Sequence, residues 1–347
     1  MNEPVSPARS ATIVDVARRA NVSKTTASDA LSGSGRVSEG TRRRIVEAAG
    51  ELGYVPNAAA RHLRSARTGT IALHIPQRAM GLTFYMEFAF AAARRAQDHG
   101  LDLTLLAPGD RTTGTPQIRA DGIILIDPMP TDPVATALAR VSLPLVCVGQ
   151  FQTTGSTPAG LLHADHGAAM RELMDHLARA GATAPAFIGT DDDFQSDWAV
   201  LIRRTYEDWC HQHDITPHIG AVATDAPTAA TSTLVTDMLT RRPDTDALIC
   251  GPDGTAQIAH HTLQNLGRTI GRDILLAACV DSPALTLCTP PVTAINLRPQ
   301  PYGHQAVELL TDLLTGTAQA PTERHHPIEL ITRTSTETMP PMTPQDC

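Results

Sequence analysis

The chain of 347 residues is 42% hydrophobic and 18% charged, which suits folded domains with large cores and excludes a disordered protein. Its net charge of −8 is unevenly divided, because residues 1–70 hold eleven Lys and Arg against six Asp and Glu. A basic end joined to an acidic body is typical of a protein that binds nucleic acid through that end.

Three short helices are predicted within residues 1–56. Thr12 and Asp15 have the spacing of a capping box at the start of the first helix, while Ser23 and Ser38 are expected to cap the second and third. Two short helices joined by a tight turn form a helix-turn-helix, although a generic three-helix interaction domain has the same periodicity. The apolar positions expected to face the core are Ile13, Val16, Ala17, Ala20, Ala27, Ala30, Leu31, Ile45, Ala48 and Leu52.

A fourth helical segment is predicted over residues 57–64. It begins with Asn57, a good N-cap, but it is too short to be a stable isolated helix. Its arginines, Arg61 among them, indicate that it becomes ordered against an anionic surface.

A resemblance to the LacI/GalR family of bacterial transcription regulators lies in the stretch TIVDVARRANVSKTTASDALSGSGRVSEGTRRRIVEAAGELGYVPNAAARHLRSARTGTIAL. The resemblance implies that Lys24, Thr25 and Asp29 face bases in the DNA major groove. It also implies that residues 57–64 are a hinge helix whose Leu63 wedges into a base step of the minor groove. The other positions expected to contact DNA are Thr12, Ser23, Thr26, Ser28, Arg36, Ser38, Thr41, Asn57, Ala60 and Arg61.

Asp29 departs from the family pattern, in which this position is most often an arginine that contacts guanine. A carboxylate cannot donate to guanine, but it can accept a hydrogen bond from cytosine N4. One interpretation is therefore an operator half-site that differs at this base pair. The alternative is that Asp29 pairs with a nearby arginine and contacts no base.

From residue 70 onward, short apolar runs alternate with helical stretches. This alternation predicts an α/β fold of parallel sheets covered by helices on both faces, and more than 250 residues favour two lobes. The predicted strands are 71–75, 101–106, 122–126, 144–149, 185–189, 218–222, 246–250, 274–279, 292–297 and 328–333. The predicted helices are 84–99, 165–180, 197–213, 227–241, 254–267 and 302–315.

The resemblance continues over this body, through CGPDGTA, CVDS and the closing stretch ELITRTST. It implies the fold of periplasmic sugar-binding proteins, in which two α/β lobes with parallel sheets are joined by three crossovers. The expected division is a headpiece (1–56), a hinge helix and linker (57–70), an N-terminal lobe (71–162 with 297–321), a C-terminal lobe (163–296 with 322–335) and a tail (336–347).

A ligand cleft is expected between the lobes, because ligands of open α/β sheets bind beyond the carboxyl ends of the strands. Acids at strand ends suit hydroxyls or amines, since carboxylates accept several hydrogen bonds. For the acids, the alternative role is capping the helix that follows the strand, and for Tyr85 it is core packing. The candidate effector-binding residues are Tyr85, Asp127, Asp165, Arg203, Asp253 and Asp281.

Three departures leave the family's sugar- or purine-binding set incomplete. Ile202 falls where an effector-binding arginine is common, which puts Arg203 on the wrong phase of its helix. Pro252 replaces the usual asparagine. The stretch from 107 to 120 is short for a helix and turn, and its glycines and prolines break helices.

These patterns predict a cytoplasmic transcriptional regulator, most often a repressor in this family. It is expected to bind a palindromic double-stranded DNA operator as a homodimer under the control of a small effector, a sugar-like or other polar metabolite. The alternatives are a regulator that has lost ligand sensing and a cytoplasmic solute-binding protein. The sequence has no catalytic, cofactor or metal-ligand motif, no apolar run that could cross a membrane and no paired cysteines, so we expect no enzyme activity, cofactor, metal or membrane contact.

Overall fold

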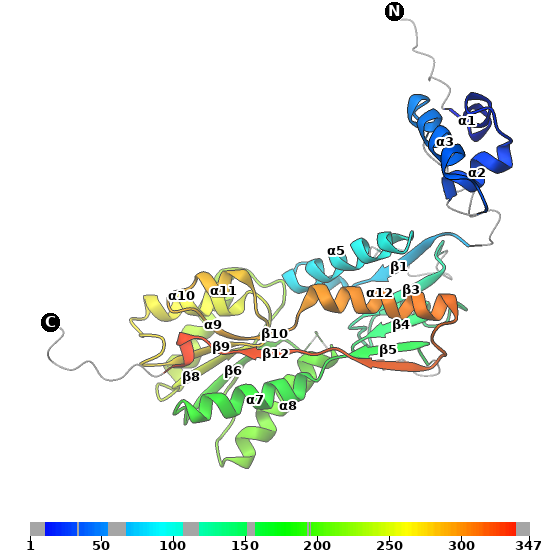
Figure 1. The fold of residues 1–347 in the computed structure, drawn as a ribbon. Coiled ribbons are helices and arrows are strands. Elements are labelled where there is room, and N and C mark those ends of the chain that lie inside the picture. The colour runs from blue at the N-terminus through cyan, green and yellow to red at the C-terminus, as the bar shows by residue number, and fades with distance from the viewer. Residues whose placement is uncertain are drawn as a thin grey trace, which may run out of the picture. The chain divides into compact units, whose positions relative to one another are not determined.

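The computed structural model describes residues 11–32, 35–54, 67–106, 118–150, 157–192, 194 and 196–337. The chain forms two compact units, Met1–Thr68, which includes the headpiece, and Gly69–Cys347, here called the body (Figure 1). The predicted hinge helix (57–64) and most of the stretch from 107 to 120 lie outside the described residues.

The headpiece contains three helices, as predicted: α1 (Ile13–Arg19), α2 (Lys24–Ser32) and α3 (Glu39–Glu51). The capping box is confirmed, because the Thr12 N–H donates to the Asp15 carboxylate (2.9 Å) and the Asp15 N–H donates to Thr12 Oγ1 (3.4 Å). Small apolar side chains from all three helices form one core, which lets the helices approach closely. They are Val16, Ala17, Ala20, Ala27, Ala30, Ile45, Ala48 and Ala49.

One predicted core position of the headpiece is wrong. Leu52 is the C-cap of α3 and 37% of its surface is exposed, because the helical phase turns it away from α1 and α2. Ala49, three residues earlier, is buried in its place.

The first sheet of the body has the strand order β11-β5-β4-β3-β1-β2, and all of its strands are parallel. Every residue of β3 and β4 is buried, as expected for central strands covered on both faces. The strands are β1 (Thr70–His74), β2 (Asp102–Leu106), β3 (Gly122–Ile126), β4 (Leu145–Val148), β5 (Gly160–His163) and β11 (Thr322–His325).

The second sheet repeats this arrangement in the order β12-β10-β9-β8-β6-β7. Its strands are parallel except β12, which runs antiparallel to β10 at the edge. The strands are β6 (Pro185–Thr190), β7 (Ile219–Val222), β8 (Ala247–Cys250), β9 (Leu275–Ala278), β10 (Thr293–Asn296) and β12 (Glu329–Ile331).

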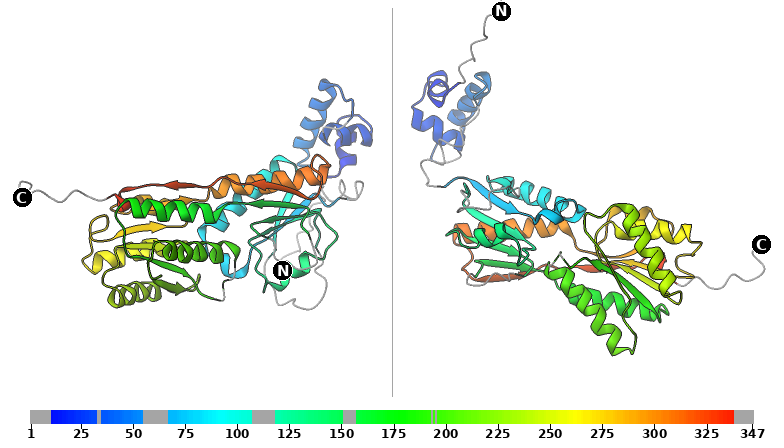
Figure 2. Two further views of the ribbon diagram at one scale, coloured as in Figure 1. Left: turned by 90° about the horizontal axis from the view of Figure 1, so that it is seen from below. Right: turned by 180° about the vertical axis from the view of Figure 1, so that it is seen from behind.

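Helices cover both faces of each sheet, and the two lobes lie side by side (Figures 1 and 2). On one face, α5 (Thr83–Asp98) and α12 (Pro299–Thr315) cover the first sheet, while α7 (His166–Arg179) and α8 (Asp197–Gln212) cover the second. The buried side chains of these helices form one apolar cluster that joins the lobes. The opposite faces carry α6 (Pro133–Leu138) on the first sheet and α9 (Thr228–Arg241), α10 (Thr255–Asn265) and α11 (Pro283–Leu287) on the second.

The ten strands predicted from apolar runs are confirmed to within two residues, and so is the alternation with helices. Two edge-side strands, β5 and β11, were not predicted, because β11 is the polar sequence Thr-Glu-Arg-His and gives no apolar signal. Since β11 pairs with β5 in the first sheet, the assignment of residues 322–325 to the C-terminal lobe is wrong. The third crossover therefore follows His325. No helix of the described ranges is long and apolar enough to span a membrane.

Candidate functional site

A cavity lies between the lobes at the carboxyl ends of their central strands. In both sheets the direction of winding reverses beside the first strand, between β1 and β3 and between β6 and β8. Doubly wound sheets bind ligands outside this reversal point. The cavity is lined by Leu82, Phe84, Tyr85, Asp127, His166, Trp198, Ile202, Asp253, Cys279, Val280, Ile295, Leu297 and Tyr302.

The cavity is small and mostly apolar in this conformation. It encloses about 30 Å³, which is room for one or two water molecules. Most of its lining side chains are aliphatic or aromatic, and its carboxylates are Asp127 and Asp253. A ligand of metabolite size can therefore enter only when the lobes move apart or side chains rearrange.

A hydrogen-bonded chain crosses the cavity from one lobe to the other. The Tyr85 hydroxyl on α5 donates to Asp127 Oδ2, which follows β3, over 2.8 Å. The Trp198 indole N–H on α8 donates to the same hydroxyl over 3.1 Å. All three side chains are buried, so the contact links the N-terminal lobe to the C-terminal lobe within an apolar environment.

The backbone around Asp127 is specialised for this position. Asp127 has φ +43°, a conformation that side chains other than glycine adopt at a cost and that is common at functional sites. Gly149, just after β4, has φ +89°, and a Cβ there would lie 2.4 Å from Asp127 Oδ1. Glycine at position 149 therefore makes room for the carboxylate.

Burial raises the pKa of Asp127 to about 7, with the Tyr85 hydrogen bond opposing the shift and the nearby Asp197 carboxylate adding to it. Such a carboxyl changes its charge close to neutral pH, as many ligand-binding and catalytic groups do. Burial lowers the pKa of His166, across the cavity, to about 4, so this imidazole is neutral under the same conditions.

Further polar contacts hold the lobes together. Asp253, in the turn after β8, accepts a hydrogen bond from the Thr83 N–H at the start of α5 (2.8 Å), so that one lobe caps a helix of the other. Arg78 of the first lobe pairs with Asp191 of the second (2.7 Å), and the Thr224 hydroxyl donates to the Arg78 carbonyl (2.9 Å). These contacts stabilise the closed arrangement.

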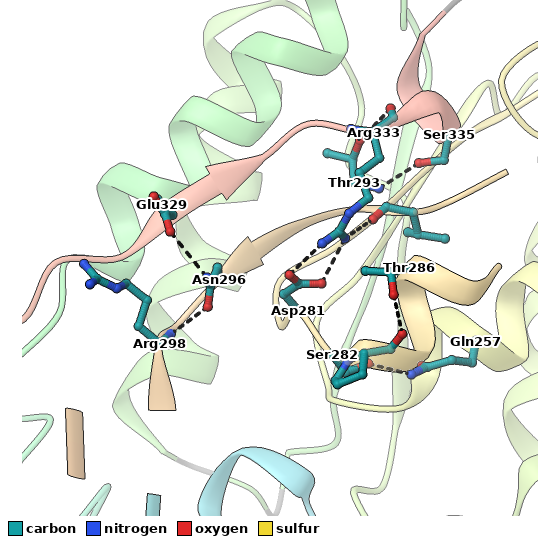
Figure 3. A network of polar contacts seen from close by, with 12 residues as sticks. Gln257, Asp281, Ser282, Thr286, Thr293, Asn296, Arg298, Glu329, Arg333 and Ser335 are labelled. Atoms are coloured by element: carbon teal, nitrogen blue, oxygen red, sulfur yellow. Dashed lines mark hydrogen bonds and ion pairs between the residues drawn. The ribbon is translucent and has the colours of Figure 1, made fainter. Parts of the chain in front are cut away.

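Asp281 was expected to line the cleft between the lobes, but it does not line the cavity. Figure 3 shows its carboxylate accepting two hydrogen bonds from the Arg333 guanidinium, at 2.9 and 2.7 Å. Arg333 lies just after β12, and both side chains are mostly buried. Asp281 is not among the residues that line the cavity, because this bidentate ion pair directs its carboxylate toward the closing strand.

Asp165 and Arg203 also lie outside the lining of the cavity. Asp165 is the N-cap of α7, accepting from the Ala168 N–H (2.8 Å), which is the alternative role considered for it. Arg203 is 42% exposed and pairs with Glu207 one helical turn away (3.2 Å). Its neighbour Ile202 faces the cavity instead. Of the six candidates, the structure brings Tyr85, Asp127 and Asp253 together.

Apart from Tyr85, the aromatic side chains of the cavity were not predicted from the sequence. Aromatic residues make up 3% of the chain, yet Phe84, Tyr85, Trp198 and Tyr302 all line this cavity. Tyr302 also stacks on His326 at the third crossover, with ring centroids 4.0 Å apart. Concentration of a rare residue type at one place is a feature that only the fold reveals.

The headpiece presents polar groups at the N-termini of its helices. The Ser23 hydroxyl accepts from the Thr26 N–H (3.0 Å), and the Ser38 hydroxyl accepts from the Thr41 N–H (3.3 Å). Both pairs of hydroxyls are also hydrogen bonded to each other at 2.8 Å. Helix N-termini of this kind are suited to phosphate groups.

The exposed face of α2 carries Lys24 and Thr25, and Asp29 is half-buried one turn further on. Asp29 lies beside Gly35, where an added Cβ would be 3.1 Å from the Asp29 carboxylate. Among the other expected DNA contacts, Thr12, Arg36 and Ser38 are exposed, while Thr26, Ser28 and Thr41 are partly buried. Asn57, Ala60, Arg61 and Leu63 lie outside the described residues.

Comparison with known sequences identifies both parts of the chain. Residues 12–57 match the family of bacterial regulatory proteins, lacI family, and residues 174–336 match the periplasmic binding protein-like domain. The chain is 27% identical to the HTH-type transcriptional regulator CelR of Thermobifida fusca over 326 residues, covering 90% of this chain and 94% of the relative. It is 29% identical to the HTH-type transcriptional regulator AscG of Escherichia coli K12 over 299 residues, covering 81% and 88%.

Solved structures share the fold. The lac repressor dimer bound to operator and the anti-inducer ONPF matches with a TM-score of 0.77 and 21% identity, covering 95% of this chain and all of that one. The complex of the transcriptional regulator CelR with cellobiose matches with a TM-score of 0.64 and 23% identity, covering 94% and 99%. The chain thus joins a helix-turn-helix domain of the lacI family to a periplasmic binding protein-like body, and over most of its length it is similar to proteins named HTH-type transcriptional regulators.

Proposed function

We propose that this regulator acts in the cytoplasm as a homodimer that binds a palindromic operator and represses transcription, and that a small molecule in the inter-lobe cavity controls the binding. The observation that carries the proposal is the combination of a helix-turn-helix headpiece with a body that has a cavity at both reversal points. A dimer supplies two headpieces, which suits half-sites about one helical turn of DNA apart.

In the headpiece, Lys24, Thr25 and Asp29 face the base edges of the major groove. The helix N-termini at Ser23 and Ser38 bind backbone phosphates, because the positive end of a helix dipole and its first N–H groups favour an anion. This division separates groups that set sequence preference from groups that set overall affinity. As the family resemblance implies, residues 57–64 contact DNA as the hinge helix.

Effector control follows from the contacts between the lobes. A ligand that enters the cavity has to displace or reorganise the Tyr85–Trp198 and Thr83–Asp253 hydrogen bonds, so it changes the relative position of the lobes. That change is transmitted to residue 69 and beyond it to the hinge, with a coupling free energy of about 1 to 3 kcal/mol. The CelR–cellobiose and lac repressor–ONPF structures support this proposal, since each is a complex of a small molecule with a protein of the same fold.

The test is selection of binding sites from random duplex DNA with the purified full chain at a stated salt concentration. The proposal predicts enrichment of a palindrome with half-sites about one helical turn apart. A matched Lys24→Ala, Thr25→Ala double variant, which leaves the headpiece core intact, should lose the preference for that palindrome. Recovery of no enriched sequence would contradict the proposed function.

A further inference from the structure

The polar atoms of the cavity wall are largely engaged within the protein. The Tyr302 hydroxyl donates to a backbone carbonyl, the Trp198 indole donates to Tyr85, and the Tyr85 hydroxyl donates to Asp127. The two carboxylates, Asp127 and Asp253, each accept a hydrogen bond but retain further acceptor positions. The wall therefore offers a ligand mostly acceptors and few donors.

This pattern does not match a polyol. Each sugar hydroxyl is both donor and acceptor, and burying one without hydrogen-bond partners weakens binding. Sites for polyols satisfy such groups with amides and guanidinium groups, but no Lys, Arg, Asn or Gln is among the described residues that line the cavity. Ile202 occupies the position where the family resemblance led us to look for an arginine.

The ionisable side chains of the cavity wall are two carboxyl groups, a tyrosine pair, a cysteine and a histidine, and no Lys or Arg is among the described lining residues. Asp127 is 9% exposed, Asp253 shares the wall, and Asp197 lies close enough to act on Asp127. The nearby Asp197 carboxylate adds to the upward shift of the Asp127 pKa that burial causes. His166 is neutral near neutral pH, so it does not compensate for the acids.

The aromatic rings complete the arrangement. Phe84 and Tyr85 meet edge to face with centroids 5.1 Å apart, and Phe84 also meets Tyr302 at 6.5 Å. The Trp198 indole approaches from the other lobe. Aromatic faces around a desolvated site attract organic cations, and more strongly when water is excluded.

We propose that the effector is an organic cation, with an ammonium group bound at Asp127 and an apolar body packed among Phe84, Tyr85, Trp198 and Tyr302. The proposal rests on the proposed function of the cavity as the effector site. It narrows the sugar-like or other polar metabolite expected from the sequence to a ligand whose donors match the acceptors of the wall. Asp253, which caps α5, is close to the same ligand and couples its binding to lobe closure.

The test is calorimetric titration of the full chain at neutral pH with three probes, 2-phenylethylammonium, n-hexylammonium and 2-(indol-3-yl)ethylammonium, at up to millimolar concentrations. The neutral isostere 2-phenylethanol and cellobiose are titrated in parallel. We expect at least one ammonium probe to bind at least about tenfold more tightly than 2-phenylethanol, since a charge-assisted contact contributes about 1.4 kcal/mol or more. Asp127→Asn should lose at least this factor, whereas the matched surface variant Asp237→Asn, on α9, should bind like the parent.

Asn at position 127 can still accept the Tyr85 hydrogen bond, so the variant is expected to fold, and its circular dichroism spectrum and thermal transition verify this. Binding of cellobiose in preference to every ammonium probe would overturn the proposal, and so would binding of none of the probes or equal binding to the Asp127→Asn variant. None of these calorimetric outcomes bears on whether the protein selects an operator. Failure to select any operator, in contrast, contradicts the proposed function and not the chemistry of the cavity.

Discussion

Asp127 and Asp281 are carboxylates at equivalent kinds of position, one after a central strand of each lobe, yet their surroundings differ. Asp281 is held by two hydrogen bonds from Arg333 of the closing strand. Asp127 has a phenol as its partner and another carboxylate nearby. The position at a strand end makes a carboxylate a candidate for ligand binding. Whether that carboxylate forms an ion pair or can bind a ligand depends on the side chain that a distant part of the chain places beside it.

The largest expected effect concerns the charge of Asp127. Because the folded state holds its proton up to pH about 7 and the unfolded chain only to about 4, the folded state loses stability as the pH rises through this window. We expect the free energy of unfolding of the Asp127→Asn variant, relative to the parent, to rise by about 3 kcal/mol between pH 5 and pH 8. Urea unfolding at several pH values measures this. A constant difference between the two proteins would show that Asp127 ionises normally.

The charged carboxylate of Asp281, unlike that of Asp127, should stabilise the folded protein. Asp281→Ala leaves the Arg333 guanidinium, 14% exposed, without its counter-charge, and we expect a loss of about 2 to 3 kcal/mol. Asp208→Ala, which breaks the exposed pair with Arg204, is the control and should cost about 0.5 kcal/mol or less. Urea unfolding at neutral pH checks both. Equal losses would remove the distinction between the buried and exposed pairs.

Gly149 tests whether Asp127 depends on the space beside it. Gly149→Ala places a methyl group against Asp127 Oδ1 at a positive φ, and we expect a loss of about 2 kcal/mol. Gly181 has a similar φ of +98° but open space around its Cβ position, so Gly181→Ala should cost only about 1 kcal/mol. Thermal unfolding of the two variants separates backbone strain from the contact with Asp127. If the two losses are equal, that contact is unimportant.

The smallest effect is expected for the inter-lobe ion pair of Arg78 and Asp191, which is partly exposed. Arg78→Ala should weaken lobe closure by about 1 kcal/mol, or about fivefold in the equilibrium constant. Spin labels at the exposed positions Phe90 on α5 and Val200 on α8 would report the distance between lobes by double electron–electron resonance. The variant should show a larger population at long distance, and an unchanged distribution would mean that this pair does not hold the lobes.

Much of the fold could be predicted because its signals are local. The capping box of Thr12 and Asp15 and the caps at Ser23 and Ser38 depend on residues three positions apart. The buried strands depend on continuous apolar runs such as Gly122–Ile126. β11 was missed because an edge strand needs only backbone pairing and carries no apolar pattern.

The cavity could be predicted only in part because its contacts are distant in sequence. Tyr85 and Asp127 are separated by 42 residues, and Asp281 and Arg333 by 52. The strand-end positions therefore indicate Asp127, Asp253 and Asp281 as candidates, but the sequence does not show which of them forms an ion pair with an arginine.

The central claim, that DNA recognition resides in the headpiece of this two-part regulator, is tested most directly by titrating the selected operator with the full chain and with a chain lacking residues 1–68. The headpiece and the body have separate cores, so the shortened chain should keep the thermal transition of the body. We expect the full chain to bind the operator at least about a thousandfold more tightly than a scrambled duplex at the same salt, and the shortened chain to bind neither. Operator binding that survives removal of the headpiece, or equal affinity of the full chain for both duplexes, would contradict it.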